Sequence, residues 1–268
     1  MFDFYRISND NVPLSNVYFP CLSILRLACL DLDPDWIAGL LRQCPVLEEI
    51  MLWEIPDHVT QAMVDAPCLA AGSNYCRLRR FHLTIYLSGI TADRPEHPLD
   101  LTRWITSAPR LEYVVLWNTY PTNHMLYCIS QIPSLKKFGT NHRGFQDSLV
   151  TTQGLLAFAT GLSSSSIMKK QAVSQLQELR LEAFKPLTDS VMKALAGIDR
   201  LKDLHICRCP FITDEGIKLF LDNKKPGSLE KLSLSYCRRV TNSGIDYAIS
   251  ILGASKVSFI HRWHPTNT

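Results

Sequence analysis

Residues 201–220 read LKDLHICRCPFITDEGIKLF, and residues 229–249 read LEKLSLSYCRRVTNSGIDYAI. Each stretch has leucine or isoleucine at its first, fourth and sixth positions, a cysteine at the ninth, and a Thr-Asp or Thr-Asn pair four residues later. Apolar residues two apart point to one face of a strand, and the apolar spacing after the threonine is that of a helix face. The repeating unit is therefore a short strand followed by a helix.

The strand pattern Leu-x-x-Leu-x-Leu, with other apolar residues allowed at each site, recurs along the whole chain in steps of 24 to 41 residues. A single unit cannot bury its own apolar face, whereas stacked units share a continuous core. We therefore predict an α/β solenoid, a horseshoe with a parallel sheet on the concave side and helices on the convex side. The eight copies start at Leu22, Leu47, Leu78, Leu111, Leu135, Leu176, Leu201 and Leu229, with a ragged ninth at Ala254.

The residues that end and begin the predicted strands and helices agree with this repeat. Prolines such as Pro45 and Pro109 come just before strands, where they end a helix and hold the chain extended. Helix starts are predicted at Asp33-Pro34-Asp35-Trp36 and at Thr188, Thr213 and Thr241, whose hydroxyls can cap backbone N–H groups. Longer loops are predicted at residues 68–76, 88–99, 141–150 and 161–171. The expected organisation is a lead-in or cap (1–21), one repeat domain (22–264) and a short tail (265–268).

The composition restricts the class of protein. The 268 residues are 46% hydrophobic and 20% charged, enough apolar material for a core, and no apolar run approaches the roughly 18 residues of a membrane span. Residues 1–11 lack the pattern of a secretory signal. The nine cysteines are scattered and odd in number, and a chain of this size does not need disulfides for stability. We expect free thiols and a soluble, cytoplasmic or nuclear protein. The net charge of +3 is split unevenly: −5 over residues 1–134 and +8 over residues 135–268.

Residues 176–195, LQELRLEAFKPLTDSVMKAL, follow the same plan with Phe184 in the cysteine position. Together, the three tandem stretches in 176–253 resemble the cysteine-containing leucine-rich repeat, Leu-x-x-Leu-x-Leu-x-x-Cys followed by Ile/Val-Thr-Asp/Asn-x-Gly-Ile. The other five copies match only its strand part. The resemblance, of the RNI-like type, implies the substrate-recognition half of F-box proteins, which bridge a target to a cullin ubiquitin ligase, or the similar repeats of the antagonist-of-mitotic-exit group.

An F-box would lie N-terminal to the repeats. Only about twenty residues precede Leu22, too few for that helical module, and residues 1–19 have no matching helical pattern. We therefore expect a chain without a visible F-box, which either acts without it or is a shortened product.

The side chains between the apolar strand residues are predicted to face outward from the concave sheet, where solenoids of this kind bind partners. Aromatic, methionine and arginine side chains gather on the N-terminal strands, and these types are enriched at binding hot spots. The hypothesis is that an apolar anchor of a protein partner sits near Trp53, Tyr113 and Trp117, flanked by Arg80, Arg180 and His205. The alternative is that these aromatics pack under the long loops. The predicted partner-binding residues are Arg26, Met51, Trp53, Arg80, His82, Tyr113, Trp117, Arg180 and His205.

The sequence has no phosphate-binding Gly-rich loop, Gly-x-Ser-x-Gly or His-Glu-x-x-His, so we predict no enzyme and no cofactor. His205, Cys207 and Cys209 resemble a metal cluster, but strand alternation places Cys209 on the opposite face, and no metal is expected. The lysine and arginine pairs of the basic half fall at different phases of the repeat, which argues against nucleic acid. The predicted function is a non-catalytic protein-interaction module, a substrate-recognition or regulatory component linked to SCF-type ubiquitin ligation. The alternative is a ubiquitin-independent scaffold or inhibitor.

Overall fold

A computed structural model describes residues 2–5, 19–28, 39–41, 43–55, 77–85, 101–142, 149–163 and 174–260. Its strands form one ten-stranded sheet in which every strand pairs in parallel with the next one along the chain. The strands are β1 (Phe2–Tyr5), β2 (Ile24–Ala28), β3 (Glu49–Ile55), β4 (Arg80–Ile85), β5 (Tyr113–Thr119), β6 (Lys137–His142), β7 (Glu178–Glu182), β8 (Asp203–Cys207), β9 (Lys231–Ser235) and β10 (Val257–Ile260).

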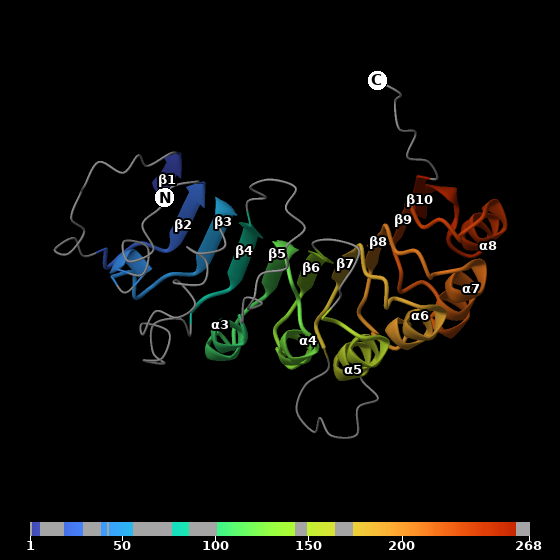
Figure 1. Ribbon diagram of the computed structural model, residues 1–268, viewed down its shortest axis with the longest axis horizontal. Helices are drawn as coiled ribbons and strands as arrows, with labels where there is room; N and C mark the ends of the chain where they lie inside the picture. Colours follow the sequence, from blue (N-terminus) through green and yellow to red (C-terminus); the bar gives the residue numbers. More distant parts are fainter. Residues whose placement is uncertain are drawn as a thin grey trace.

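The described helices connect successive strands and lie along the outer side of the arc that the strands form (Figure 1). This is the predicted α/β solenoid, with the sheet on the concave side. The helices described from end to end are α3 (Thr102–Ser107), α4 (Asn123–Ser130), α5 (Thr152–Leu162), α6 (Asp189–Leu195), α7 (Asp214–Asn223) and α8 (Asn242–Leu252), and the 3₁₀ helix η2 (Ala254–Lys256) follows α8.

The core lies between the sheet and the helices, because the strand residues of the leucine pattern point toward the helix layer. Leu25, Ile50 and Phe81 occupy the same register position in neighbouring strands and are at most 3% exposed. In β6, where the leucine pattern ends at Phe138, the fully buried Thr140 takes the next inward position. Each repeat thus adds one layer to a shared core.

Left-handed backbone occurs where strands end or shift register. Ala183, Arg208 and Tyr236 directly follow β7, β8 and β9, and their amides bond across to the next repeat, whereas Glu54 and Asn118 lie at the register shifts inside β3 and β5. The N–H of Ala183 donates to the carbonyl of Cys207 (2.9 Å), and the N–H of Arg208 donates to that of Ser235 (2.8 Å). The left-handed residues are Glu54, Asn118, Ala183, Arg208 and Tyr236.

Successive helix starts are joined by side-chain hydrogen bonds. The Asp189 carboxylate accepts from the backbone N–H (2.9 Å) and the hydroxyl (2.7 Å) of Thr213, the N-cap of the next helix. Asp214 does the same for Thr241. A Cβ added to Gly216 would overlap the Asp189 carboxylate, which explains the glycine three residues after the threonine. The Thr-Asp/Asn-x-Gly segment is therefore a joint between repeats.

The predicted helix caps are at the correct positions, but only one of the three threonine hydroxyls makes the predicted capping hydrogen bond. Thr188, Thr213 and Thr241 are N-caps, but of these only Thr241 accepts a bond from its own helix, from the Ser243 N–H (3.2 Å). The Thr213 hydroxyl instead donates to the preceding repeat. The expected helix start at 33–36 lies outside the described residues.

The cysteines of the repeat face the core, as the resemblance implied. Cys209 and Cys237 are at most 2% exposed, and their thiols donate to the carbonyls of Cys207 (3.3 Å) and Ser235 (3.6 Å). Burial raises the pKa of both thiols, so they stay protonated at neutral pH. Cys21, Cys44, Cys207, Cys209 and Cys237 are free cysteines.

Three boundaries differ from expectation. Strand β1 extends the sheet before β2, in the predicted lead-in region, although residues 2–5 lack the leucine pattern. Strand β6 includes residues 141 and 142, which were expected to be a loop. Helix α5 continues through Gly161, where a linker was expected, and a Cβ at Gly161 would overlap the Ser130 side chain of α4. Most of the predicted loops lie outside the described residues.

Candidate functional site

The outward side chains of the concave face form rows that cross the sheet, because the parallel register aligns equivalent residues of neighbouring strands. The structure places the predicted partner-binding residues on this face. Their side chains are partly buried, except that of Arg80, which is exposed. They are Arg26 of β2, Met51 and Trp53 of β3, Arg80 and His82 of β4, Tyr113 and Trp117 of β5, Arg180 of β7 and His205 of β8.

Glu49 organises the N-terminal part of the face. Its carboxylate accepts from the Arg26 guanidinium (Nη2 to Oε1, 2.9 Å) on one side and from Arg80 (Nη1 to Oε2, 3.1 Å) on the other. The Glu49 side chain is only 6% exposed, and a carboxylate at that depth needs such partners. The Arg80 guanidinium also lies 5.0 Å from the ring centroid of Tyr113, a cation–π arrangement.

Trp53 and His82 lie next to this ion cluster. Their ring centroids are 6.0 Å apart in an edge-to-face arrangement, and the His82 Nε2 is 3.2 Å from the Thr84 hydroxyl. Burial lowers the pKa of His82, and the nearby Lys137 adds to this effect. His82 is therefore neutral at physiological pH and can accept or donate a hydrogen bond.

The second aromatic group is centred on Trp117. Gly139 lies between the two side chains on the neighbouring strand: a Cβ there would be 3.7 Å from both Trp117 Cζ2 and Arg180 Cβ, an ordinary van der Waals distance. The Arg180 guanidinium lies 4.8 Å from the Trp117 ring centroid, so the cation stacks on the indole across the glycine. Arg180 Nε is buried and has no hydrogen-bond partner among the described residues, while Arg180 Nη2 is 3.9 Å from the Glu182 carboxylate.

His205 of β8 pairs in register with Arg180 of the preceding strand, β7. Burial is the main cause that lowers the pKa of His205, and the Arg180 charge adds to it. The structure thus divides the predicted residues into two groups. The N-terminal group contains the ion cluster, Met51, Trp53, His82 and Tyr113, and the central group contains Trp117, Arg180 and His205. Both combine aromatic surface with cations, an arrangement suited to binding apolar and acidic side chains of a protein.

The sequence did not single out Glu49 or Gly139 as site residues. The role of Glu49 depends on arginines 23 and 31 positions away in the sequence. The signal for Gly139 is a glycine inside a strand, which marks a close approach of other groups. The alternative interpretation, in which the aromatics pack under long loops, involves loops outside the described residues.

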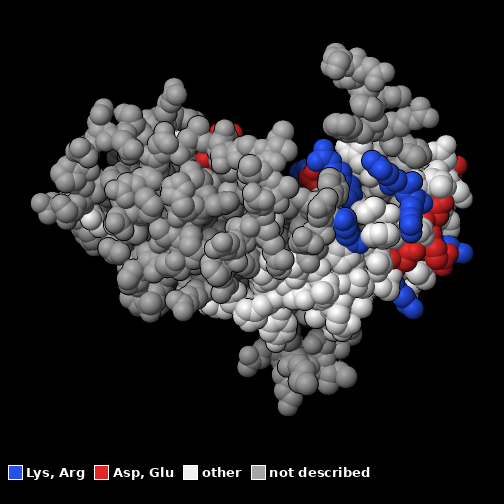
Figure 2. All heavy atoms as spheres, in the orientation of Figure 1, with Lys and Arg blue, Asp and Glu red and all other residues white. Residues whose placement is uncertain are grey.

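Several lysines of the basic C-terminal half are paired or buried, and others are exposed. Figure 2 shows Lys and Arg side chains gathered over the C-terminal repeats with Asp and Glu beside them. Lys136 and Lys137 form ion pairs with Glu112 (2.8 Å) and Glu178 (2.7 Å), and Lys224 is buried. These three lysines are therefore less available for phosphate contacts, whereas Lys225, Arg238 and Arg239 are exposed. Another lysine pair of the basic half, Lys169 and Lys170, lies outside the described residues.

Cys207, expected to be exposed beside His205, is only 7% exposed, and Cys209 faces the core. Within the described part of the chain, no cluster of three or more His, Cys, Asp or Glu residues could hold a metal ion. The described helices include none long and apolar enough to cross a membrane.

A family model described as "FBD-associated F-box protein At5g56370, LRR repeats" matches residues 1–170 of this chain. The chain belongs to this family. The match covers the N-terminal repeats, whereas the resemblance seen in the sequence was carried by residues 176–253, so leucine-rich-repeat character extends over both parts. The predicted relationship to F-box-associated leucine-rich-repeat proteins is confirmed, and the family supports a protein-interaction module.

Among solved structures, 55 chains match. One, "Crystal structure of Rad7 and Elc1 complex in yeast", superposes with a TM-score of 0.57 at 18% sequence identity. The match covers 88% of this chain and 56% of that chain, so this chain spans little more than half the length of the yeast protein. At this identity the likeness shows the fold alone. No curated protein matches the sequence.

Proposed function

We propose that the concave face captures a segment of a protein partner, as a substrate-recognition or regulatory component linked to SCF-type ubiquitin ligation. The observation that carries the proposal is the Trp117–Arg180 stack across Gly139, which holds a large aromatic side chain in place on the partner-facing sheet. A side chain held in place loses little entropy on binding, which is how hot-spot residues contribute affinity. Trp53 of β3 and Tyr113 of β5 supply further aromatic surface on the same face.

The link to ubiquitin ligation is supported by the name of the family, an F-box protein, and by a structural relative that was solved in a complex with Elc1. The second candidate is a scaffold or inhibitor unconnected with ubiquitin. It would use the same concave face without a ligase adaptor. No catalytic role is proposed, and the expected compartment remains cytoplasmic or nuclear.

The test is affinity capture of the tagged chain from reducing cell extract, analysed by mass spectrometry, beside the Trp53→Ala/Trp117→Ala variant. A matched control is Tyr127→Ala/Phe211→Ala, which removes two aromatic side chains that are 51% and 43% exposed outside the predicted partner-binding set. We expect the partner to be lost with the first variant and retained with the control, with equal melting temperatures for the two variants.

Recovery of a cullin and its adaptor would support the ligase role. A partner that is sensitive to the tryptophan variant and arrives without them would support the scaffold. A partner retained in full by the tryptophan variant would contradict the concave-face proposal.

A further inference from the structure

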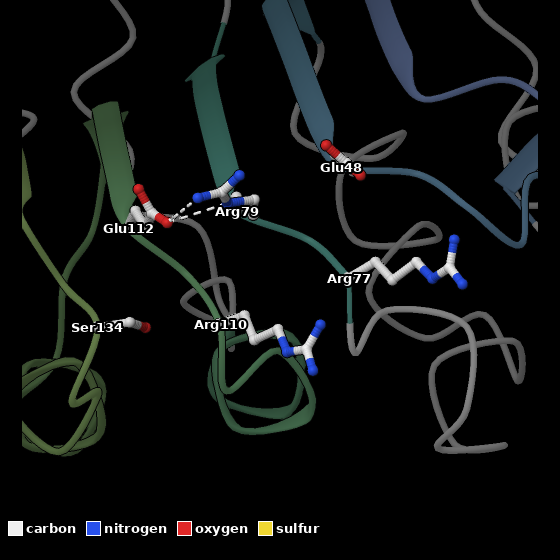
Figure 3. Close-up of a pocket in the computed structure, with 6 residues that line it drawn as sticks. All are labelled: Glu48, Arg77, Arg79, Arg110, Glu112 and Ser134. Carbon is white, nitrogen blue, oxygen red and sulfur yellow. Dashed lines mark hydrogen bonds and ion pairs between the residues drawn. The ribbon is translucent and has the colours of Figure 1, made fainter.

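A pocket lies away from the concave face, at the edge of the sheet where the strands begin (Figure 3). Its volume is about 430 Å³. The lining residues come from the links that lead into β3, β4, β5 and β6, so the pocket is built by four consecutive repeats. They are Glu48, Arg77, Arg79, Arg110, Glu112 and Ser134.

Part of the charge in this pocket is already neutralised. Glu112 accepts from Arg79 (Nε, 2.9 Å) on one side and from Lys136 (2.8 Å) on the other. The bonds from Lys136 and Arg79 lower the pKa of Glu112, so it stays ionised. The Ser134 hydroxyl donates to the Leu111 carbonyl (2.8 Å). These residues form a wall whose polar groups are satisfied.

Arg77 and Arg110 are different. Both are exposed, and neither forms an ion pair or side-chain hydrogen bond with any described residue. Each lies three residues before the first residue of its strand, Arg80 or Tyr113, and these two residues pair in register. Arg77 and Arg110 therefore occupy equivalent places in adjacent repeats. Figure 3 shows both guanidinium groups extended away from the Arg79–Glu112 pair. Both line the same pocket, so an anion held in it would be attracted by both charges.

The charge count favours an anionic occupant. Including Lys136, four cations face two carboxylates, and one of these, Glu112, already serves two cations. Guanidinium groups bind carboxylates through paired, charge-assisted hydrogen bonds. A cavity of about 430 Å³ is much larger than a single small anion and suits several side chains of an extended segment.

We propose that this edge pocket binds an acidic segment of a protein partner, whose neighbouring Glu or Asp carboxylates pair with Arg77 and Arg110. The proposal rests on the protein-binding function proposed above and adds a contact outside the concave face. Glu48, on the opposite wall, repels such a segment and sets how tightly it binds.

The probe is a fluorescently labelled peptide of glycine and serine with three consecutive glutamates at its centre, and fluorescence anisotropy with the purified full chain gives its affinity. The reference peptide has glutamine in place of glutamate. We expect the acidic peptide to bind at least tenfold more tightly, with an affinity that falls as salt is added. Arg77→Gln/Arg110→Gln should weaken binding about tenfold, and Glu48→Gln should strengthen it several-fold.

The matched control is Arg238→Gln/Arg239→Gln, which makes the same change in net charge at two exposed arginines in another repeat. We expect it to leave binding unchanged. Equal loss in this control would overturn the proposal, as would equal binding of the acidic and glutamine peptides. Displacement of the peptide by millimolar inorganic phosphate would also overturn it, in favour of a small-anion site.

The Trp53→Ala/Trp117→Ala variant should bind the acidic peptide normally. Its behaviour separates the two proposals, because failure of the concave-face capture leaves the peptide result unaffected, and the reverse holds as well.

Discussion

Single residues on the concave face are held by interactions that cross from strand to strand, and Glu49 is the strongest case. Its carboxylate is the shared acceptor for Arg26 and Arg80, so removing its charge leaves two neighbouring guanidinium groups without a counterion. We expect Glu49→Gln to lower the free energy of unfolding by about 1–2 kcal/mol.

Urea denaturation measures this effect. Glu182→Gln is the control, because Arg180 and Arg208 lie farther from its carboxylate, at 3.9 and 3.4 Å, and its loss should be smaller. Equal losses for the two variants would contradict the role assigned to Glu49.

The two histidines of the concave face predict sensitivity to acid. Burial lowers the pKa of His82 and His205 below the unfolded value near 6.5, so below that pH the unfolded chain binds more protons than the folded one. Their contribution to stability is therefore present near neutral pH and is lost as the pH falls below about 6.5.

Thermal unfolding between pH 7.5 and 5 tests this. We expect His82→Gln/His205→Gln to lose less stability over this interval than the natural protein. Parallel curves for the two proteins would show that these histidines do not titrate on unfolding.

At the residue scale, the sequence could predict which face each strand residue occupies, because alternation has a period of two. It could not predict that Glu49 is shared by two arginines or that Trp117 stacks on Arg180. Both depend on the register of strands that are separated by long, variable links, and on Gly139, which no leucine pattern marks.

At the scale of elements, the joint between α6 and α7 makes a quantitative prediction. Gly216→Ala places a methyl group onto the Asp189 carboxylate, which must then give up its bonds to Thr213. We expect a loss of about 3 kcal/mol for Gly216→Ala and about 1 kcal/mol for Asp189→Ala.

The double variant distinguishes this contact from a general defect of the helix. Removing Asp189 vacates the space that the new methyl group needs, so the double variant should be more stable than Gly216→Ala alone. Simple additivity of the two losses in denaturant unfolding would refute the contact.

Lys224, at the end of α7, gives a prediction at alkaline pH. It is 6% exposed, its ammonium contacts the Ile198 carbonyl after α6, and burial lowers its pKa from 10.5 to about 8. Between these values the folded chain binds fewer protons than the unfolded one, so stability rises with pH. Relative to Lys224→Met, the natural protein should gain up to about 3 kcal/mol from pH 8 to 10.5.

Chemical denaturation of both proteins across this range isolates Lys224, because the other alkaline groups are common to the two. A difference that stays constant with pH would mean that Lys224 has an ordinary pKa.

For the whole molecule, each described strand contacts only its immediate neighbours in the sheet, so stability should decrease toward the ends. We expect amide hydrogen exchange to be slowest in β5 to β8 and faster in β1 and β10, each of which pairs with a single strand. Mass spectrometry of peptic fragments measures this, and uniform protection along the sheet would contradict the repeat-by-repeat picture.

The order of β2 to β10 could be predicted from the leucine pattern, because each copy must add a strand beside the previous one. Strand β1 could not, since Phe2-Asp3-Phe4-Tyr5 has the alternation of any short strand and stands apart from the repeat. The edge pocket was also not foreseen. It needs Arg77 and Arg110 to be neighbours, although 33 residues separate them in the sequence.

The joint between repeats has a consequence for how such a chain can grow. Residues 188–212 carry an acceptor, Asp189, for the following repeat, while Thr213 begins a segment that presents both the donor for the preceding repeat and a new acceptor, Asp214. Each such segment therefore carries both a donor for the preceding repeat and an acceptor for the following one, in the same geometry. A tandem duplication of one repeat would find both of its connections already made, so the arc can be lengthened without redesigning its neighbours.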